Sequence, residues 1–108
     1  MSGEFAGTLR QRIMIERPTL LRTPSGLQEA GWEPVATCLA AVVADGVGAE
    51  AEGQALSANP RFRVTIRQRD GISVGQRVIW GERVMLVRQR IDDPRSPERI
   101  IVRCEEMR

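Results

Sequence analysis

The sequence predicts an all-β fold, a small antiparallel β-barrel or sandwich of about six strands with one long loop that has room for a short helix. Three observations favour this class. Apolar and polar residues alternate along several segments, as they do in half-buried strands. Glycine and proline turn signals separate these segments, and the chain of 108 residues, 42% of them hydrophobic, suffices for the core of one domain.

The first element is a strand that begins soon after the N-terminus. Residues 1–8 show no periodicity and are predicted to form a flexible N-terminal arm, ahead of a single domain over residues 9–106. Residues 9–16 largely alternate between apolar and polar side chains and predict the strand. We expect Pro18 to end it, because proline cannot donate a hydrogen bond to a strand ladder. The turn that follows is Thr23-Pro24-Ser25-Gly26.

The second element covers residues 32–44. Its later part is almost continuous in small apolar side chains, which favours a buried strand. Periodicity alone does not separate such a strand from a short helix, so both remain open here.

Residues 45–60 form the predicted long loop, rich in glycine, alanine and glutamate. A connection of about sixteen residues is long for a compact domain, and such loops are often functional or disordered. Residues 50–56 have room for one or two helical turns when packed. The loop residues that we single out are Asp45, Gly46, Gly48, Glu50, Glu52 and Gly53.

The strand predicted over residues 61–69 has the clearest alternation in the chain. Phe62, Val64 and Ile66 occupy one face, and the other carries guanidinium groups about 7 Å apart along the strand. We expect a partner bearing carboxylates or other acidic groups to face this row. The exposed face consists of Arg61, Arg63, Thr65, Arg67 and Arg69.

Three further strands of a meander complete the domain. Gly81 suits the first central position of a type II′ hairpin turn, whose twist matches that of paired strands. Arg88 and Arg90 are expected to share one face of their strand, and Arg99 and Arg103 one face of theirs. The strands are predicted over residues 77–80, 83–91 and 99–105, with turns at residues 70–71, 81–82 and 92–97.

Side-chain chemistry argues against enzymatic activity. The chain has no histidine and no lysine, so no serine has an imidazole or an amine to activate it, and imidazole-ligated metal sites are excluded. A mechanism that uses carboxylates alone stays open at this point. Residues 46–51 match a dinucleotide-binding glycine pattern but lack the helix and parallel sheet that such a site needs. Asp92 and Asp93 are interpreted as turn residues rather than a cation site. We therefore expect no enzymatic activity, no metal and no cofactor.

Cys38 and Cys104 lie in apolar stretches and are interpreted as reduced core thiols. A disulfide between them requires a fold that brings them together.

Neither a transmembrane helix nor a secretory leader is evident in the sequence. We expect a soluble protein made inside the cell, without a membrane partner.

The arginine-bearing strands admit three interpretations. A net charge of only +2 is a weak signal for nucleic acid, and few aromatic residues are available to stack on bases. A small basic β-barrel that binds single-stranded nucleic acid is the alternative function. The others are an ordinary solvated face and a protein interface, in which arginine is enriched.

In their order and spacing, several short motifs resemble the phage head–tail joining proteins, also called head-closure or stopper proteins, which have relatives in prophages and gene transfer agents. The resemblance covers residues 9–106. Leu39, Gln68 and Val84 depart from it, since aromatic residues are common at or near these positions. The motifs are Leu9-Arg10-Gln11-Arg12-Ile13-Met14-Ile15, Gly26, Gly31-Trp32, Ala40, Val42, Ile66-Arg67, Arg77-Val78, Asp92 and Val102-Arg103-Cys104-Glu105.

The resemblance implies a structural subunit of a ring that closes the DNA-filled head. The ring would be a homo-hexamer or homo-dodecamer in the particle neck, assembled in the host cytoplasm between the portal or adaptor and the tail proteins. DNA would contact it transiently while passing through the channel. The long loop would project toward the channel as a gate.

A ring also gives the arginines a function. Subunits in a head-to-tail ring present different surfaces to each other, so arginines of one barrel would pair with carboxylates of its neighbour or of the adaptor. The interface arginines predicted in this way are Arg61, Arg63, Arg67, Arg69, Arg88 and Arg90, and the acidic partners are Glu16, Glu29, Glu98 and Glu105.

The gating hypothesis predicts the outcome of a deletion. Removing residues 46–57 should leave the barrel folded, because the loop is outside the predicted strands, but should yield particles that leak DNA or fail to join tails. Particle morphology and DNA content in electron micrographs would measure this, and normal particles would contradict the hypothesis.

Overall fold

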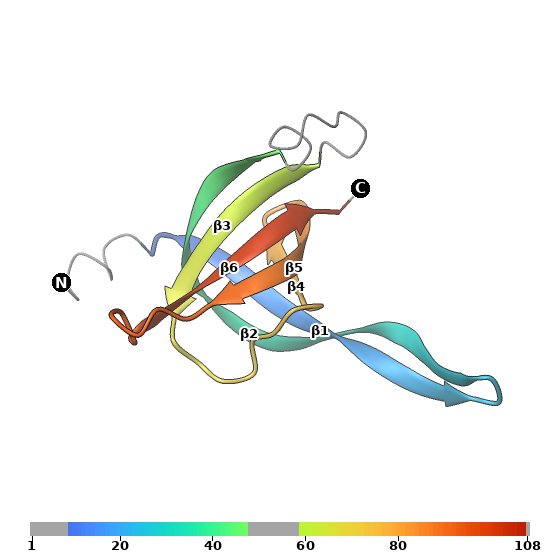
Figure 1. The fold of residues 1–108 in the computed structure, drawn as a ribbon. Coiled ribbons are helices and arrows are strands. Elements are labelled where there is room, and N and C mark those ends of the chain that lie inside the picture. The colour runs from blue at the N-terminus through green and yellow to red at the C-terminus, as the bar shows by residue number, and fades with distance from the viewer. Residues whose placement is uncertain (1–8, 48–58, 108) are drawn as a thin grey trace.

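The computed structural model describes residues 9–47 and 59–107, and it confirms the all-β prediction. Six antiparallel strands close into a barrel, in the order β1-β2-β3-β6-β5-β4 (Figure 1). In the described part of the chain there is no helix that could span a membrane. The strands are β1 (Gln11–Thr23), β2 (Gly26–Val47), β3 (Pro60–Arg67), β4 (Arg77–Trp80), β5 (Arg83–Ile91) and β6 (Arg99–Glu106).

Alternation of side chains builds the core, as the sequence predicts. On β3, Phe62, Val64 and Ile66 point inward and are buried, whereas Arg61 and Arg63 are exposed. Each strand of a closed barrel has one inward face, so the six inward faces meet in a single core. Fully buried members of it include Ile13, Ile15, Val78, Met85, Val87, Ile100 and Val102.

The first hairpin is longer than the sequence predicts. Pro18 does not end β1, which continues to Thr23 and pairs with β2 along its whole length. Among the residues that the structure describes, no third strand pairs with β1 beyond Glu16, which leaves this edge of the strand open. Proline is tolerated on such an edge, because its missing N–H leaves no ladder partner unsatisfied. Residues 19–31 thus form a two-stranded extension, here called the hairpin arm, that projects from the barrel (Figure 1).

The long second element is a strand, not a helix, and it shortens the predicted loop. Asp45, Gly46 and Val47 belong to β2, and Pro60 pairs with Val47 at the start of β3. An irregularity in the ladder between Ala44 and Val47 accommodates this extension. The expected loop boundaries at residues 45 and 60 are therefore wrong. The other loop residues that we singled out, Gly48, Glu50, Glu52 and Gly53, the proposed short helix and the arm over residues 1–8 lie outside the described residues.

The predicted hairpin turns are confirmed. Gly26 has a φ of 123° after the turn at residues 24–25, and Thr23 donates a hydrogen bond from its hydroxyl to the Gly26 carbonyl. Gly81 has a φ of 60°, while Glu82 beside it keeps a negative φ. This combination is that of a type II′ turn, since a type I′ turn would require positive φ at both residues.

The connection over residues 68–76 crosses from β3 to β4 and covers one end of the barrel. Ile72 is buried with 3% of its surface exposed, and it belongs to the core cluster. Gln76, also buried, accepts a hydrogen bond from the Ser73 N–H and donates one from its amide to the Gly71 carbonyl. These bonds satisfy the polar atoms of a loop packed on an apolar interior.

A short ladder between β1 and β4 closes the barrel. It pairs Met14 with Ile79, Ile15 with Val78 and Glu16 with Arg77. At its end the Arg77 Nε lies 2.7 Å from the Glu16 Oε1, and both side chains are mostly covered. The Arg77 guanidinium also lies 4.4 Å from the centroid of the Trp32 ring. Strand pairing, an ion pair and a cation–π contact therefore all stabilise the contact between β1 and β4 that closes the barrel.

We expect Glu16→Gln to lower the free energy of unfolding by about 1–3 kcal/mol, because it leaves a mostly covered Arg77 without its counter-charge. Chemical denaturation monitored by tryptophan fluorescence would measure the change. The matched control is Glu33→Gln, since Glu33 pairs with Arg17 in the open and such pairs contribute only about 0–1 kcal/mol. Equal effects of the two variants would contradict a special role for the closing pair.

Candidate subunit interface

The predicted arginine row exists on β3 but is shorter than expected. Arg61, Arg63 and Arg67 are exposed on its outer face. β3 ends at Arg67, so Arg69 lies beyond the strand, exposed in the connection to β4. The outer face therefore carries three strand arginines, with Thr65 between the last two.

Strand β6 places a second line of charges beside this row. Arg63 lies directly opposite Arg103, Arg67 opposite Arg99, and Arg61 opposite Glu105. Arg99 and Arg103 share the outer face, as the sequence predicts, because residues directly opposite each other in a ladder point to the same side. Two like-charged pairs thus meet across the ladder, which is unfavourable unless a carboxylate intervenes.

Asp45 is the carboxylate that separates Arg63 from Arg103. Its Oδ2 lies 2.8 Å from the Arg103 Nη2, and its Oδ1 lies 3.6 Å from the Arg63 Nη2. Only 16% of the Asp45 side chain is exposed. We predicted Asp45 to lie in the long loop, whereas it is fixed at the end of β2. The sequence contains no local signal for this bridge, because its three residues are far apart along the chain.

A bulge on β5 separates Arg88 from Arg90. The ladder with β6 shifts between Val87 and Gln89, so that Arg88 is the extra residue. Arg90 consequently pairs with Val102, whose side chain points into the core. The prediction that Arg88 and Arg90 share one face is therefore wrong.

Arg88 stays on the outer face and contributes to a shallow pocket. Its guanidinium lies 2.9 Å from a Glu105 carboxylate oxygen. The pocket, about 450 Å³ in volume, presents three guanidinium groups against one carboxylate. An acidic side chain of a partner suits it, since arginine binds carboxylates with two parallel hydrogen bonds. Its lining consists of Arg61, Arg88, Gln89, Arg103, Cys104 and Glu105.

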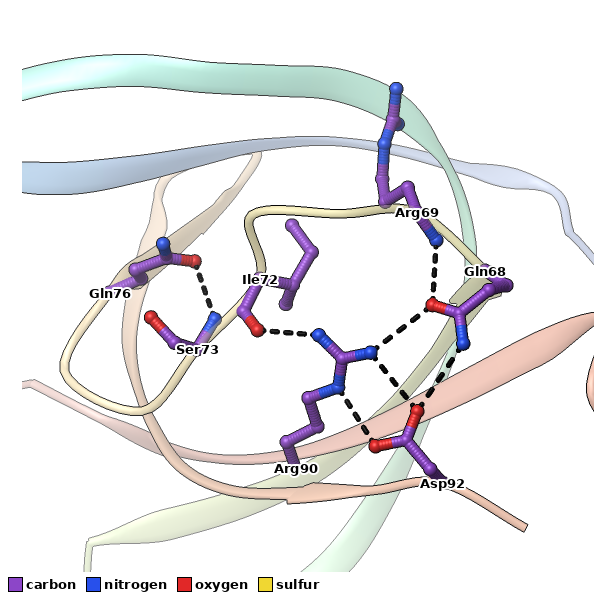
Figure 2. Close-up of polar contacts among 7 residues, drawn as sticks. All are labelled: Gln68, Arg69, Ile72, Ser73, Gln76, Arg90 and Asp92. Atoms are coloured by element: carbon purple, nitrogen blue, oxygen red, sulfur yellow. Dashed lines mark hydrogen bonds and ion pairs between the residues drawn. The ribbon is translucent and has the colours of Figure 1, made fainter. Parts of the chain in front are cut away.

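The Arg90 side chain forms its hydrogen bonds within the same chain, to Asp92, Ile72 and Gln68 (Figure 2). Its Nε and Nη2 bond both carboxylate oxygens of Asp92, at 2.9 and 3.0 Å. Its Nη1 donates to the Ile72 carbonyl at 2.7 Å, and Nη2 also reaches the Gln68 side chain. Arg90 therefore ties the connection over residues 68–76 to β5.

The Arg90–Asp92 contact shifts the pKa values of both side chains. Hydrogen bonding to Arg90 lowers the pKa of Asp92, and the same bond raises the pKa of Arg90. A carboxyl group whose pKa is lower in the folded chain stabilises the fold above its unfolded pKa of about 3.9, and this contribution is lost as pH falls through the folded pKa.

We therefore expect Asp92→Asn to be less stable than the wild type at pH 7, and the difference to shrink as the pH falls below about 4. Urea unfolding at pH 7 and pH 3 would measure it. Asp93→Asn serves as the control at pH 7, because Asp93 accepts a backbone N–H bond from Arg95 that an asparagine oxygen also accepts. An Asp92→Asn deficit that is unchanged at pH 3 would contradict an ionic role for this carboxylate.

Both cysteines are free thiols, as predicted. Cys104 is buried, and burial raises the pKa of its thiol to about 12. Cys38 is half-buried.

The described residues contain no cluster of acidic, cysteine or histidine side chains able to hold a metal ion. Asp93 caps the turn at residues 94–95, as interpreted, while Asp92 also binds Arg90. The available chemistry is that of arginine, namely binding to carboxylates or phosphates.

Comparison with known proteins identifies the family. The model of the phage head completion protein family matches residues 6–107. The chain belongs to this family. It is thus a phage head completion protein, a structural component of the virion and not an enzyme, as expected from the sequence.

Two solved structures share the fold of this head completion protein. Protein SF1141 from Shigella flexneri 2a is 28% identical, with a TM-score of 0.64 over 93% of this chain and 94% of that one. A chain from the virion of a native gene transfer agent particle has a TM-score of 0.72 at 19% identity, over 92% of this chain and 96% of that one. No curated protein matches the sequence.

Proposed function

We propose that this head completion protein is a subunit of a ring that joins the head to the tail and closes the DNA-filled head, between the portal or adaptor and the tail. Family membership supports a place in the finished head. The shared fold with a chain of a gene transfer agent virion supports a structural role for this barrel in a particle.

The observation that supports the proposal is that some arginines of the outer face have no ion-pair partner within the described residues. Most arginines of the barrel are matched within the chain, Arg77 by Glu16, Arg88 by Glu105 and Arg103 by Asp45. Arg61 and Arg67, in contrast, form no ion pair with any residue that the structure describes. They lie at opposite ends of β3, exposed on its outer face, where a partner's carboxylates would reach them.

A ring requires each subunit to present two different surfaces. The basic outer face is one of them. Among the acidic partners expected from the sequence, Glu16 and Glu105 are engaged within the chain, whereas Glu29 and Glu98 form no ion pair with a described residue. Closure of the channel by the long loop rests on the family resemblance. Deletion of residues 48–57 tests it separately, because Gly46 and Val47 belong to β2.

Single-stranded nucleic acid is a poorer partner for this surface. Binding without sequence preference normally uses exposed aromatic rings as stacking platforms. The three aromatic rings in the described part of the chain are engaged internally: Phe62 packs edge-on against Trp80, with centroids 5.7 Å apart, and Arg77 covers Trp32.

The double variant Arg61→Glu, Arg67→Glu should fold like the wild type but fail to join heads to tails. Both side chains are exposed, and exposed substitutions usually change stability by only about 0.5 kcal/mol. Complementation of a host that lacks the wild-type copy, followed by counting joined and unjoined particles, would measure the defect.

The matched control is Arg95→Glu, because Arg95 lies on the loop after β5 with 93% of its side chain exposed. It should join particles normally. Normal joining by the double variant would overturn the proposed role of this face, and absence of the wild-type protein from purified particles would overturn the proposed function.

A further inference from the structure

The hairpin arm exposes apolar side chains that the barrel does not cover. Leu20 and Leu27 have 60% and 62% of their surface exposed, and Leu21 has 56%. An isolated two-stranded ribbon is marginal in water, and several exposed leucines on it are unfavourable unless a partner covers them.

The two faces of the arm differ in chemistry, because only one of them carries charged side chains. Leu20 pairs with Glu29 and Arg22 with Leu27, so these four side chains share one face. Leu21 and Gln28, opposite each other, occupy the other face. The first face thus combines two leucines with one carboxylate, Glu29, and one guanidinium, Arg22, and neither charge forms an ion pair with a described residue.

A complementary surface lies at the start of β1. Leu39, 48% exposed, lies opposite Arg12 on the outer face. It borders a pocket of about 360 Å³ that Arg67 also lines. Arg12 and Arg67 form no ion pair with any residue that the structure describes. The pocket is lined by Leu9, Cys38, Leu39, Arg67, Gln68 and Arg69.

These two surfaces cannot meet within one chain. The pocket is beside the beginning of β1 and the arm is its end, and 13 residues of extended strand span about 40 Å. Figure 1 shows the arm projecting away from the barrel, on the side opposite the start of β1. A contact between them must join two copies, end to end.

We infer that the hairpin arm of one subunit docks on the next copy of this chain, with Leu27 in the pocket beside Cys38 and Leu39 and with Glu29 between Arg12 and Arg67. The inference rests on the proposed ring and specifies its subunit contact. Because the arm and the pocket are different surfaces, the contact is heterologous and continues from copy to copy.

A cysteine placed on the arm tests the contact, because the pocket already holds a thiol. In particles carrying Leu27→Cys, oxidation with diamide should link residue 27 of each subunit to Cys38 of the next. A non-reducing gel should then show a ladder of this chain extending beyond the dimer. Cys104 is buried in the core and does not compete.

Two control variants make the result specific. Leu21→Cys places the thiol on the opposite face of the same arm, and Leu27→Cys with Cys38→Ser removes the acceptor; neither should give a ladder. A band at the dimer alone would indicate a reciprocal contact and would overturn the end-to-end arrangement.

Separate outcomes identify which inference fails. If the Leu27→Cys protein is present in joined particles but does not cross-link to itself, the arm docks elsewhere, for example on the adaptor or tail, and the inference is wrong. If the wild-type chain is absent from particles, the proposed function is wrong instead.

A charge exchange provides an independent readout. Glu29→Arg and Arg12→Glu should each lower the number of joined particles, and the double variant should restore most of them. Failure of the double variant to recover, with both single variants folded, would also overturn the contact.

Discussion

The β1–β4 ladder is the contact on which the rest of the structure depends. Only three residue pairs, Met14 to Glu16 with Arg77 to Ile79, join the first strand of the barrel to the last in the sheet order. Without them the sheet would have two open edges, which are prone to pairing with other chains. With them, every strand acquires a fixed inner and outer face, and the position of each arginine follows.

Closure of the barrel also explains why some arginines of the outer surface have a carboxylate partner within the chain and others do not. Carboxylates from distant parts of the chain, such as Asp45 and Glu105, are brought beside Arg103 and Arg88 by the strand register. Arg12, Arg61 and Arg67 remain without such partners in the described part of the chain. Exposed ion pairs contribute little to folding, about 0–1 kcal/mol each, so these unmatched arginines are better explained by binding than by stability.

The sequence patterns predicted those parts of the fold that depend only on residues near each other in the chain. The inward face of β3 follows from alternation, and the type II′ turn at Gly81 follows from the φ that glycine allows. The extension of β1 past Pro18 was not predicted, because tolerance of proline depends on whether a third strand pairs there. The Arg90 side chain was misplaced because a bulge reverses the alternation, and one residue of shift turns every later side chain to the other face.

The candidate interface was predictable only in outline. The arginines of β3 are apparent from the sequence, but their neutralisation is not, since Asp45 reaches Arg103 only through two ladders, β2–β3 and β3–β6. The hairpin arm was missed because Pro18 was expected to end the strand. A signal did exist, since leucines occur on both sides of the turn at residues 24–25, where paired strands would place them on one ribbon.

Amide hydrogen exchange along β1 in the isolated protein tests the central claim most directly. The strand passes from a closed barrel into an unsupported ribbon, so its two halves should differ. We expect slow exchange with global unfolding for the hydrogen-bonded amides of residues 13–16 and of β4, and fast exchange through local opening for residues 19–23. Uniform protection along β1, or exchange of β4 as fast as that of the hairpin arm, would contradict closure by this ladder.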